Sequence, residues 1–188
     1  MSARRGPVLP ICVFALPWRL SGYRYLNAGR WPLGFRHRLV RQPSRADALC
    51  LAGHVLTAAE RFLDVNGVRL RVYDAGPPDA PLVILAHGFP ELAFSWRHQI
   101  PVLAAAGYRV LAPDQRGYGG SSRPEQVEAY DITALTADLV GLIDAVGAER
   151  AAVVGHDWGA VVAWSTPLLH PDRVAAVAVF GNPATKFG

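Results

Sequence analysis

The sequence predicts an α/β fold for residues 60–188, with a mostly parallel sheet flanked by helices. Three observations support this prediction. A hairpin pattern surrounds Asn66-Gly67, a continuous apolar run follows at Leu82–Ala86, and the rest of the chain alternates between helix-like and strand-like segments. The implied order β-β-β-α-β-α-β-α-β places helices on both faces of the sheet and a functional site at the carboxyl ends of the strands.

The first two strands are expected near residues 61–65 and 68–75. Apolar and polar residues alternate on both sides of Asn66-Gly67, and this dipeptide is a strong signal for a two-residue hairpin turn. A turn-rich segment at residues 76–79 then separates the hairpin from Leu82–Ala86, whose five apolar residues suit a strand that is buried on both faces.

Helices and strands alternate after this buried strand. A helix is expected near 94–106, ended by Gly107, with a strand at 109–112 after it. A second helix is expected over 131–146, because its leucine and isoleucine residues recur at helical spacing. The last three elements are a strand at 151–154, a helix at 160–169 that stops before Pro171, and a strand at 174–180.

Residues 1–59 differ from the rest in charge and pattern. They contain nine arginines and one carboxylate, whereas residues 60–188 contain ten basic residues and fourteen carboxylates. No helical or strand period is sustained in this first third, so we predict that 1–59 is a basic, disordered extension and 60–188 a partial domain. The net acidic charge of that domain argues against a nucleic-acid partner.

The same first third bears on localisation. Arg4-Arg5 and the apolar residues after them loosely resemble a secretory signal, but Pro10 interrupts the apolar run and no convincing cleavage site follows. No apolar stretch reaches the roughly 20 residues that a membrane span needs. We therefore expect a cytoplasmic protein without a membrane span. Cys12 and Cys50 are read as two unlinked thiols, and no metal site is expected.

A candidate nucleophile stands between the strand at 151–154 and the helix that follows it. The motif is GHDWG at residues 155–159, and glycines on either side of a central residue are typical of a nucleophile elbow. The central residue, Asp157, is a carboxylate that can attack an electrophilic carbon and form an ester. Taken alone, the spacing fits a helix N-cap equally well.

A second motif strengthens the nucleophile hypothesis. The strand at 82–86 ends in His87-Gly88-Phe89-Pro90, and the loop after this strand donates a backbone N–H to the oxyanion hole in hydrolases that have a nucleophile elbow. The second donor is the N–H of the residue after the nucleophile. The candidate donors here are the backbone N–H groups of Phe89 and Trp158.

Four motifs in this order resemble the N-terminal half of epoxide hydrolases of the α/β-hydrolase fold superfamily. They are HGFPE at 87–91, SWRHQ at 95–99, DQRGYG at 114–119 and GHDWG at 155–159. The resemblance implies that Asp157 opens an epoxide by attack on carbon, and that water hydrolyses the resulting ester to a diol without a cofactor. It also implies a cis peptide bond between Phe89 and Pro90.

The other polar residues of these motifs are expected to have structural roles. Strand alternation predicts that His156 points away from Asp157, and His87 is read as a structural or hydrogen-bonding residue of the oxyanion loop. The DQRGYG block recurs in α/β-hydrolases of varied chemistry, so Asp114 is expected to brace a loop rather than to catalyse.

The resemblance stops before the cap domain of that family, which implies that the cap tyrosines, a later acid and the water-activating histidine are absent. We therefore expect a poorly soluble chain without multiple turnover, whose sheet ends in an exposed apolar edge strand at 174–180.

Two alternatives remain. A haloalkane dehalogenase also uses an elbow Asp followed by Trp, but Phe89 replaces the halide-binding Asn of that family. The chain is otherwise a non-catalytic remnant, or half of a two-chain assembly whose complementing partner supplies the C-terminal half. A serine esterase is excluded by Asp157.

Overall fold

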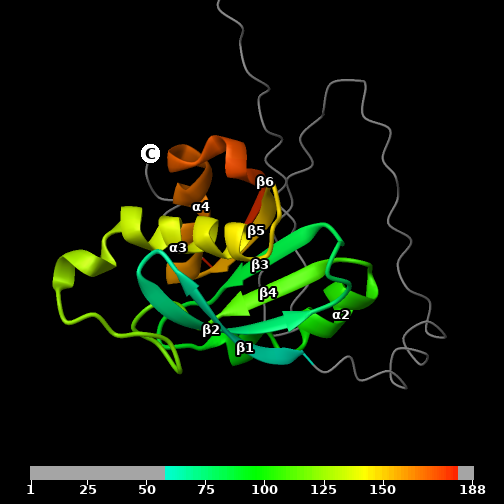
Figure 1. Cartoon of the computed structure of the whole chain (residues 1–188), viewed down its shortest axis with the longest axis horizontal. Helices are drawn as coiled ribbons and strands as arrows, with labels where there is room; N and C mark the ends of the chain where they lie inside the picture. Colours follow the sequence, from blue (N-terminus) through cyan, green and yellow to red (C-terminus); the bar gives the residue numbers. More distant parts are fainter. Residues whose placement is uncertain (1–57, 182–188) are drawn as a thin grey trace, which may run out of the picture. The chain divides into compact units, whose positions relative to one another are not determined.

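The computed structural model describes residues 58–181, which form a six-stranded sheet with helices on both faces (Figure 1). The predicted extension at 1–59 lies almost entirely outside the described residues. The strands are β1 (Ala59–Val65), β2 (Val68–Ala75), β3 (Leu82–Ala86), β4 (Arg109–Pro113), β5 (Ala151–His156) and β6 (Val174–Phe180). Their spatial order is β1-β2-β4-β3-β5-β6. The strands β4, β3, β5 and β6 run parallel, and the hairpin β1-β2 joins β4 in antiparallel fashion.

The helices confirm the predicted alternation. They are α2 (Gln99–Ala105), α3 (Ile132–Ala145) and α4 (Trp158–Leu169), with short 3-10 helices η1 (Ala93–Trp96), η2 (Val127–Tyr130) and η3 (Pro171–Arg173). The predicted order of strands and helices is therefore confirmed. The structure adds η2 and η3, which the sequence patterns did not indicate.

One predicted helix is wrong in detail. The segment expected as a single helix near 94–106 is divided into η1 and α2, with Arg97 and His98 between them. Pro101 explains the break, because in a continuous helix its ring would clash with the carbonyl of Arg97, four residues earlier. Pro101 is tolerated in the first turn of α2, where the missing N–H would have no partner within the helix.

The core consists of two apolar clusters on opposite faces of the sheet. The first cluster packs α3 and α4 against the sheet, and it includes Leu142, Val162 and Val153. The second packs η1 and α2 against the other face, and it includes Ile100 and Leu85. Because β3 is buried along its whole length, its carboxyl end is a fixed position from which the next loop departs. Among the described residues, no helix is both long and apolar enough to cross a membrane.

Candidate active site

The two sequence motifs meet because their strands are neighbours in the sheet. β3 pairs with β5 in parallel register, and Ala86 lies opposite Gly155 at the end of the pairing. The loop that begins at His87 therefore leaves the sheet beside the turn that carries Asp157. A contact between residues about 70 positions apart follows directly from strand order and register.

Asp157 has the backbone conformation of a nucleophile elbow. Its φ is 51° and its ψ is −118°, values that a non-glycine residue adopts only when its surroundings enforce them. The flanking glycines permit the close approach: a Cβ at Gly155 would lie 2.1 Å from the carbonyl oxygen of Gly159, and a Cβ at Gly159 would lie 2.2 Å from that of Ala86. The sharp turn lets α4 begin immediately, at Trp158 rather than at the expected position 160.

The Asp157 carboxylate is held by the backbone of the oxyanion loop. The N–H of Phe89 donates to Oδ1 at 3.0 Å. This hydrogen bond lowers the pKa of Asp157, and the backbone N–H of Trp158 lowers it further. Asp157 precedes α4 but its side chain makes no capping hydrogen bond. The geometry therefore favours a nucleophile over the N-cap that its spacing equally allowed, and it keeps the carboxylate ionised at neutral pH.

The two expected oxyanion donors both lie at this turn, and their side chains are exposed. Phe89 is 61% exposed and Trp158 is 60% exposed. The backbone N–H of Phe89 reaches the carboxylate directly, whereas that of Trp158 acts on the pKa of Asp157 without a hydrogen bond of full geometry. The peptide bond between Phe89 and Pro90 is cis, as the resemblance implied.

His156 contacts the oxyanion loop through Glu91. Its Nδ1 lies 3.3 Å from Oε2 of Glu91. Burial alternates regularly along β5 up to His156, its last residue. Glu91 belongs to the HGFPE motif, but its partner lies 65 residues away and no spacing rule connects the two.

Asp114 braces the loops behind the site, as expected. Its carboxylate is fully buried and accepts hydrogen bonds from the backbone N–H groups of Ala93 at 2.9 Å and Gly120 at 3.0 Å. Its Oδ2 also pairs with Nη2 of Arg71 at 2.8 Å. These contacts join the loop after β3, the loop after β4 and strand β2.

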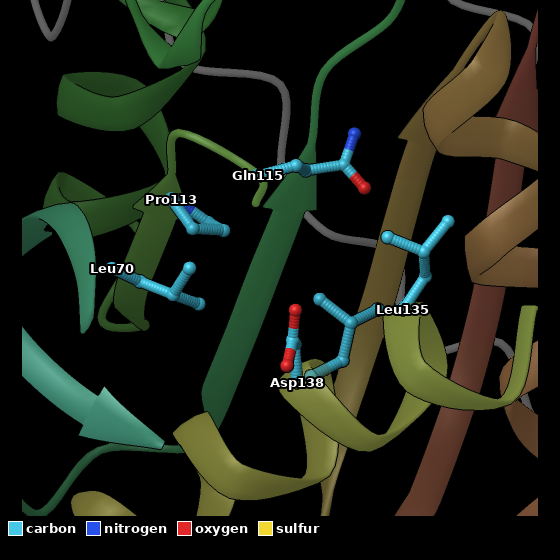
Figure 2. A pocket seen from close by; sticks show the side chains of 6 residues that line it. Leu70, Pro113, Gln115, Leu135 and Asp138 are labelled. Atoms are coloured by element: carbon cyan, nitrogen blue, oxygen red, sulfur yellow. The ribbon is translucent and has the colours of Figure 1, made fainter. Parts of the chain in front are cut away.

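A small pocket lies away from Asp157, between β2, the end of β4 and α3. Figure 2 shows Leu135 and Asp138 from α3 on one side of it, and Gln115, Pro113 and Leu70 around the rest; Leu139 completes the lining. It has room for about one water molecule, so it is too small for an organic substrate. Within residues 58–181, no group of three or more His, Cys, Asp or Glu side chains is arranged to hold a metal ion.

Comparison with protein families gives one match over most of the domain. The family model described as alpha/beta hydrolase fold matches residues 81–188. This range includes the oxyanion loop, the DQRGYG block and the elbow.

Individual relatives are similar over the same region. The chain is 78% identical over 125 residues to epoxide hydrolase A of Mycobacterium tuberculosis, and the matched region covers 66% of this chain and 39% of that relative. It is 49% identical over 117 residues to bifunctional epoxide hydrolase 2 of Sus scrofa, over 62% of this chain and 21% of the relative. The crystal structure of epoxide hydrolase A from Mycobacterium thermoresistibile superposes with a TM-score of 0.65 at 69% identity, over 65% of this chain and 39% of that one. The chain thus spans about two fifths of the length of epoxide hydrolase A.

Proposed function

The chain belongs to the α/β-hydrolase fold family, and from that premise we propose that it carries the nucleophile and oxyanion hole of an epoxide hydrolase. The observation that supports this most strongly is the Asp157 carboxylate, which stands on an elbow turn with Oδ1 hydrogen-bonded to the N–H of Phe89. Relatives at 78% and 51% identity are named epoxide hydrolases, which supports an epoxide as the substrate class.

The first step is nucleophilic attack on a ring carbon. Since Oδ1 already accepts a hydrogen bond from Phe89, Oδ2 is the oxygen that attacks. A bond forms between Oδ2 and one ring carbon, the bond between that carbon and the epoxide oxygen breaks, and the oxygen, still bonded to the other carbon, becomes an alkoxide that takes up a proton from water. The low pKa of Asp157 ensures that the nucleophile is ionised when the substrate binds.

The second step is hydrolysis of the ester. Water adds to the carboxyl carbon of Asp157, and negative charge develops on Oδ1, which faces the N–H of Phe89, while the N–H of Trp158 acts on the same carboxyl group. Donors aimed at the developing charge lower the barrier and so raise the rate, typically by a factor of about 10² to 10³ for each donor. Collapse of the adduct breaks the bond between the carboxyl carbon and Oδ2, so the diol leaves with Oδ2 and takes up the proton that the attacking water loses, and the water oxygen completes the restored carboxylate.

The ester is the species to test. Incubation of the full chain with a simple aryl epoxide should add the mass of one epoxide to the protein, and peptide mapping should place it on Asp157. Asp157→Ala should abolish the adduct because it removes the nucleophile, whereas Asp79→Ala, at an exposed carboxylate away from the site, should leave the yield unchanged. An equal adduct yield in Asp157→Ala would refute the assignment.

A haloalkane of the same carbon skeleton separates the two enzyme hypotheses. Phe89 offers a ring where a halide needs a second side-chain donor beside Trp158, so the proposed function expects adduct formation with the epoxide and none with the haloalkane. Halide release, with an Asp157 ester formed from the haloalkane and none formed from the epoxide, would favour a dehalogenase.

A further inference from the structure

His87 is the most completely enclosed histidine at the candidate site, and both of its ring nitrogens are engaged. Its side chain is 0% exposed. Nδ1 lies 2.8 Å from the carbonyl oxygen of Gly88, and Nε2 lies 3.0 Å from the backbone nitrogen of Gln115. The Gln115 side chain returns a third contact, from Nε2 to the carbonyl oxygen of His87 at 2.7 Å.

These partners define the tautomer of the ring. A backbone N–H can only donate, so Nε2 must be the acceptor from Gln115, and a carbonyl oxygen can only accept, so Nδ1 must carry the proton. The Gln115 contact requires the neutral ring, and the Gly88 contact places its one proton on Nδ1. Burial lowers the pKa of His87 and so favours that neutral form, although the hydrogen bond to the Gly88 carbonyl and the charges of Asp114 and Glu91 act in the opposite direction. The edge contact with the Tyr118 ring, at 4.9 Å between centroids, encloses the imidazole further.

The carbonyl that His87 holds belongs to the same peptide unit as a candidate oxyanion donor. The Gly88 carbonyl and the Phe89 N–H are the two ends of one planar peptide group, and they point in opposite directions in the trans form. On one side this carbonyl accepts hydrogen bonds from His87 and from the N–H of Glu91, at 3.1 Å. On the other side the Phe89 N–H donates to Asp157. Fixing the carbonyl therefore fixes the direction of the donor.

We propose that His87 is a positioning residue, whose Nδ1–H orients the Gly88-Phe89 peptide so that the Phe89 N–H points at Oδ1 of Asp157. The role in catalysis rests on the proposed function, because the oriented donor is the one that stabilises the ester and its adduct. His87 itself touches no reacting atom. Its two ring nitrogens are occupied by backbone groups, so it has no free nitrogen with which to activate water.

Two substitutions separate orientation of this peptide from simple filling of space. In His87→Asn the side-chain amide nitrogen can take the place of Nδ1 and keep the bond to the Gly88 carbonyl. In His87→Gln the longer side chain can reach the place of Nε2 and accept from Gln115, but it loses the donor to Gly88. The proposal expects His87→Asn to resemble the parent chain and His87→Gln to lose the oriented N–H.

The first readout is hydrogen exchange of the Phe89 amide in ¹⁵N-labelled full chain. A hydrogen bond to a carboxylate protects this amide, and its loss in His87→Gln should speed exchange by about tenfold or more. Asp157→Asn supplies the reference for a weakened acceptor. Parent-like protection in His87→Gln, or equal loss in both His87 variants with unchanged thermal midpoints, would overturn the proposal.

The second readout needs no substitution, and so remains available if a variant does not fold. Long-range ¹H–¹⁵N spectra of the parent chain should show His87 with a proton on Nδ1 and none on Nε2. A proton on Nε2 would contradict the proposal. Neither measurement depends on epoxide chemistry, so failure of the orientation and failure of the proposed function are distinguished: the latter appears only in the Asp157 adduct.

Discussion

At the scale of single residues, the candidate site holds one charged and one neutral ionisable group. Asp157 is kept as an anion because backbone N–H groups lower its pKa. His87 is kept neutral because burial lowers its pKa and its contact with the Gln115 N–H fits only the uncharged ring. The first state suits the nucleophile that we propose, and the second preserves a hydrogen-bond acceptor for Gln115 that a protonated ring would lose.

The neutral state of His87 predicts a pH dependence of stability. Between its ordinary pKa of 6.5 and its lower value in the folded chain, the unfolded state binds a proton that the folded state does not. The free energy of unfolding should therefore decrease as the pH falls below about 6.5. Urea titrations at several pH values between about 7.5 and 5 would measure this, with His87→Asn as the non-titrating control. The dependence of Asp157 lies in a different window, because its lowered pKa affects stability only near and below its ordinary value of 3.8. An equally steep slope in His87→Asn would assign the effect to another group.

At the scale of elements, the sequence patterns predicted the order and type of every strand and α-helix, because burial on both faces and helical spacing leave direct traces in composition. The errors lie at the ends of the helices and at the break between η1 and α2. The break at Arg97-His98 follows from Pro101, a local signal that the apolar periodicity concealed. The contacts of the site were harder to predict from the sequence. Gln115 and His87 are 28 residues apart, and only strand order and register bring the two together.

The hairpin turn shows how one residue serves two elements. Asn66 and Gly67 have φ values of 47° and 74°, which confirms the predicted two-residue turn. The Asn66 side chain also donates to the Ala134 carbonyl oxygen at 3.1 Å and to Oδ1 of Asp138 at 3.0 Å, both in α3. Asp138 in turn pairs with the buried Arg116, so the turn is attached to an ion pair inside the domain.

This double role predicts different costs for two substitutions of Asn66. Asn66→Gly keeps the left-handed conformation and loses the bonds to α3, so it should lower the free energy of unfolding by about 1 kcal/mol. Asn66→Ala loses those bonds and also imposes a strained φ, which adds about 1–2 kcal/mol. Urea denaturation of the three chains tests the order. Equal stability of the glycine variant and the parent would mean that the contacts with α3 contribute nothing.

At the scale of the whole molecule, the described residues depend on one sheet with an apolar cluster on each face. The chain corresponds to only 39% of the length of epoxide hydrolase A, yet residues 58–181 bury side chains on both sides of β3 and β5. Alternate residues of the same strands belong to different clusters: Ile84 packs toward α3 and α4, and Leu85 packs toward α2. Neither face can lose its packing without disturbing strands that the other face requires.

Two substitutions, one in each cluster, test this dependence. Leu142→Ala removes a fully buried side chain beneath α3, and Leu85→Ala removes one that is 1% exposed on the opposite face. Each should lower the free energy of unfolding by about 2–5 kcal/mol, since buried leucines leave cavities of this cost. Because both faces share the strands, far-ultraviolet and tryptophan-fluorescence transitions should shift together in both variants. Trp96 reports on the α2 face and Trp164 belongs to α4, so the fluorescence covers both layers. If the tryptophan and far-ultraviolet transitions separated in Leu85→Ala, the two faces would not unfold as one unit, and the dependence on shared strands would be wrong.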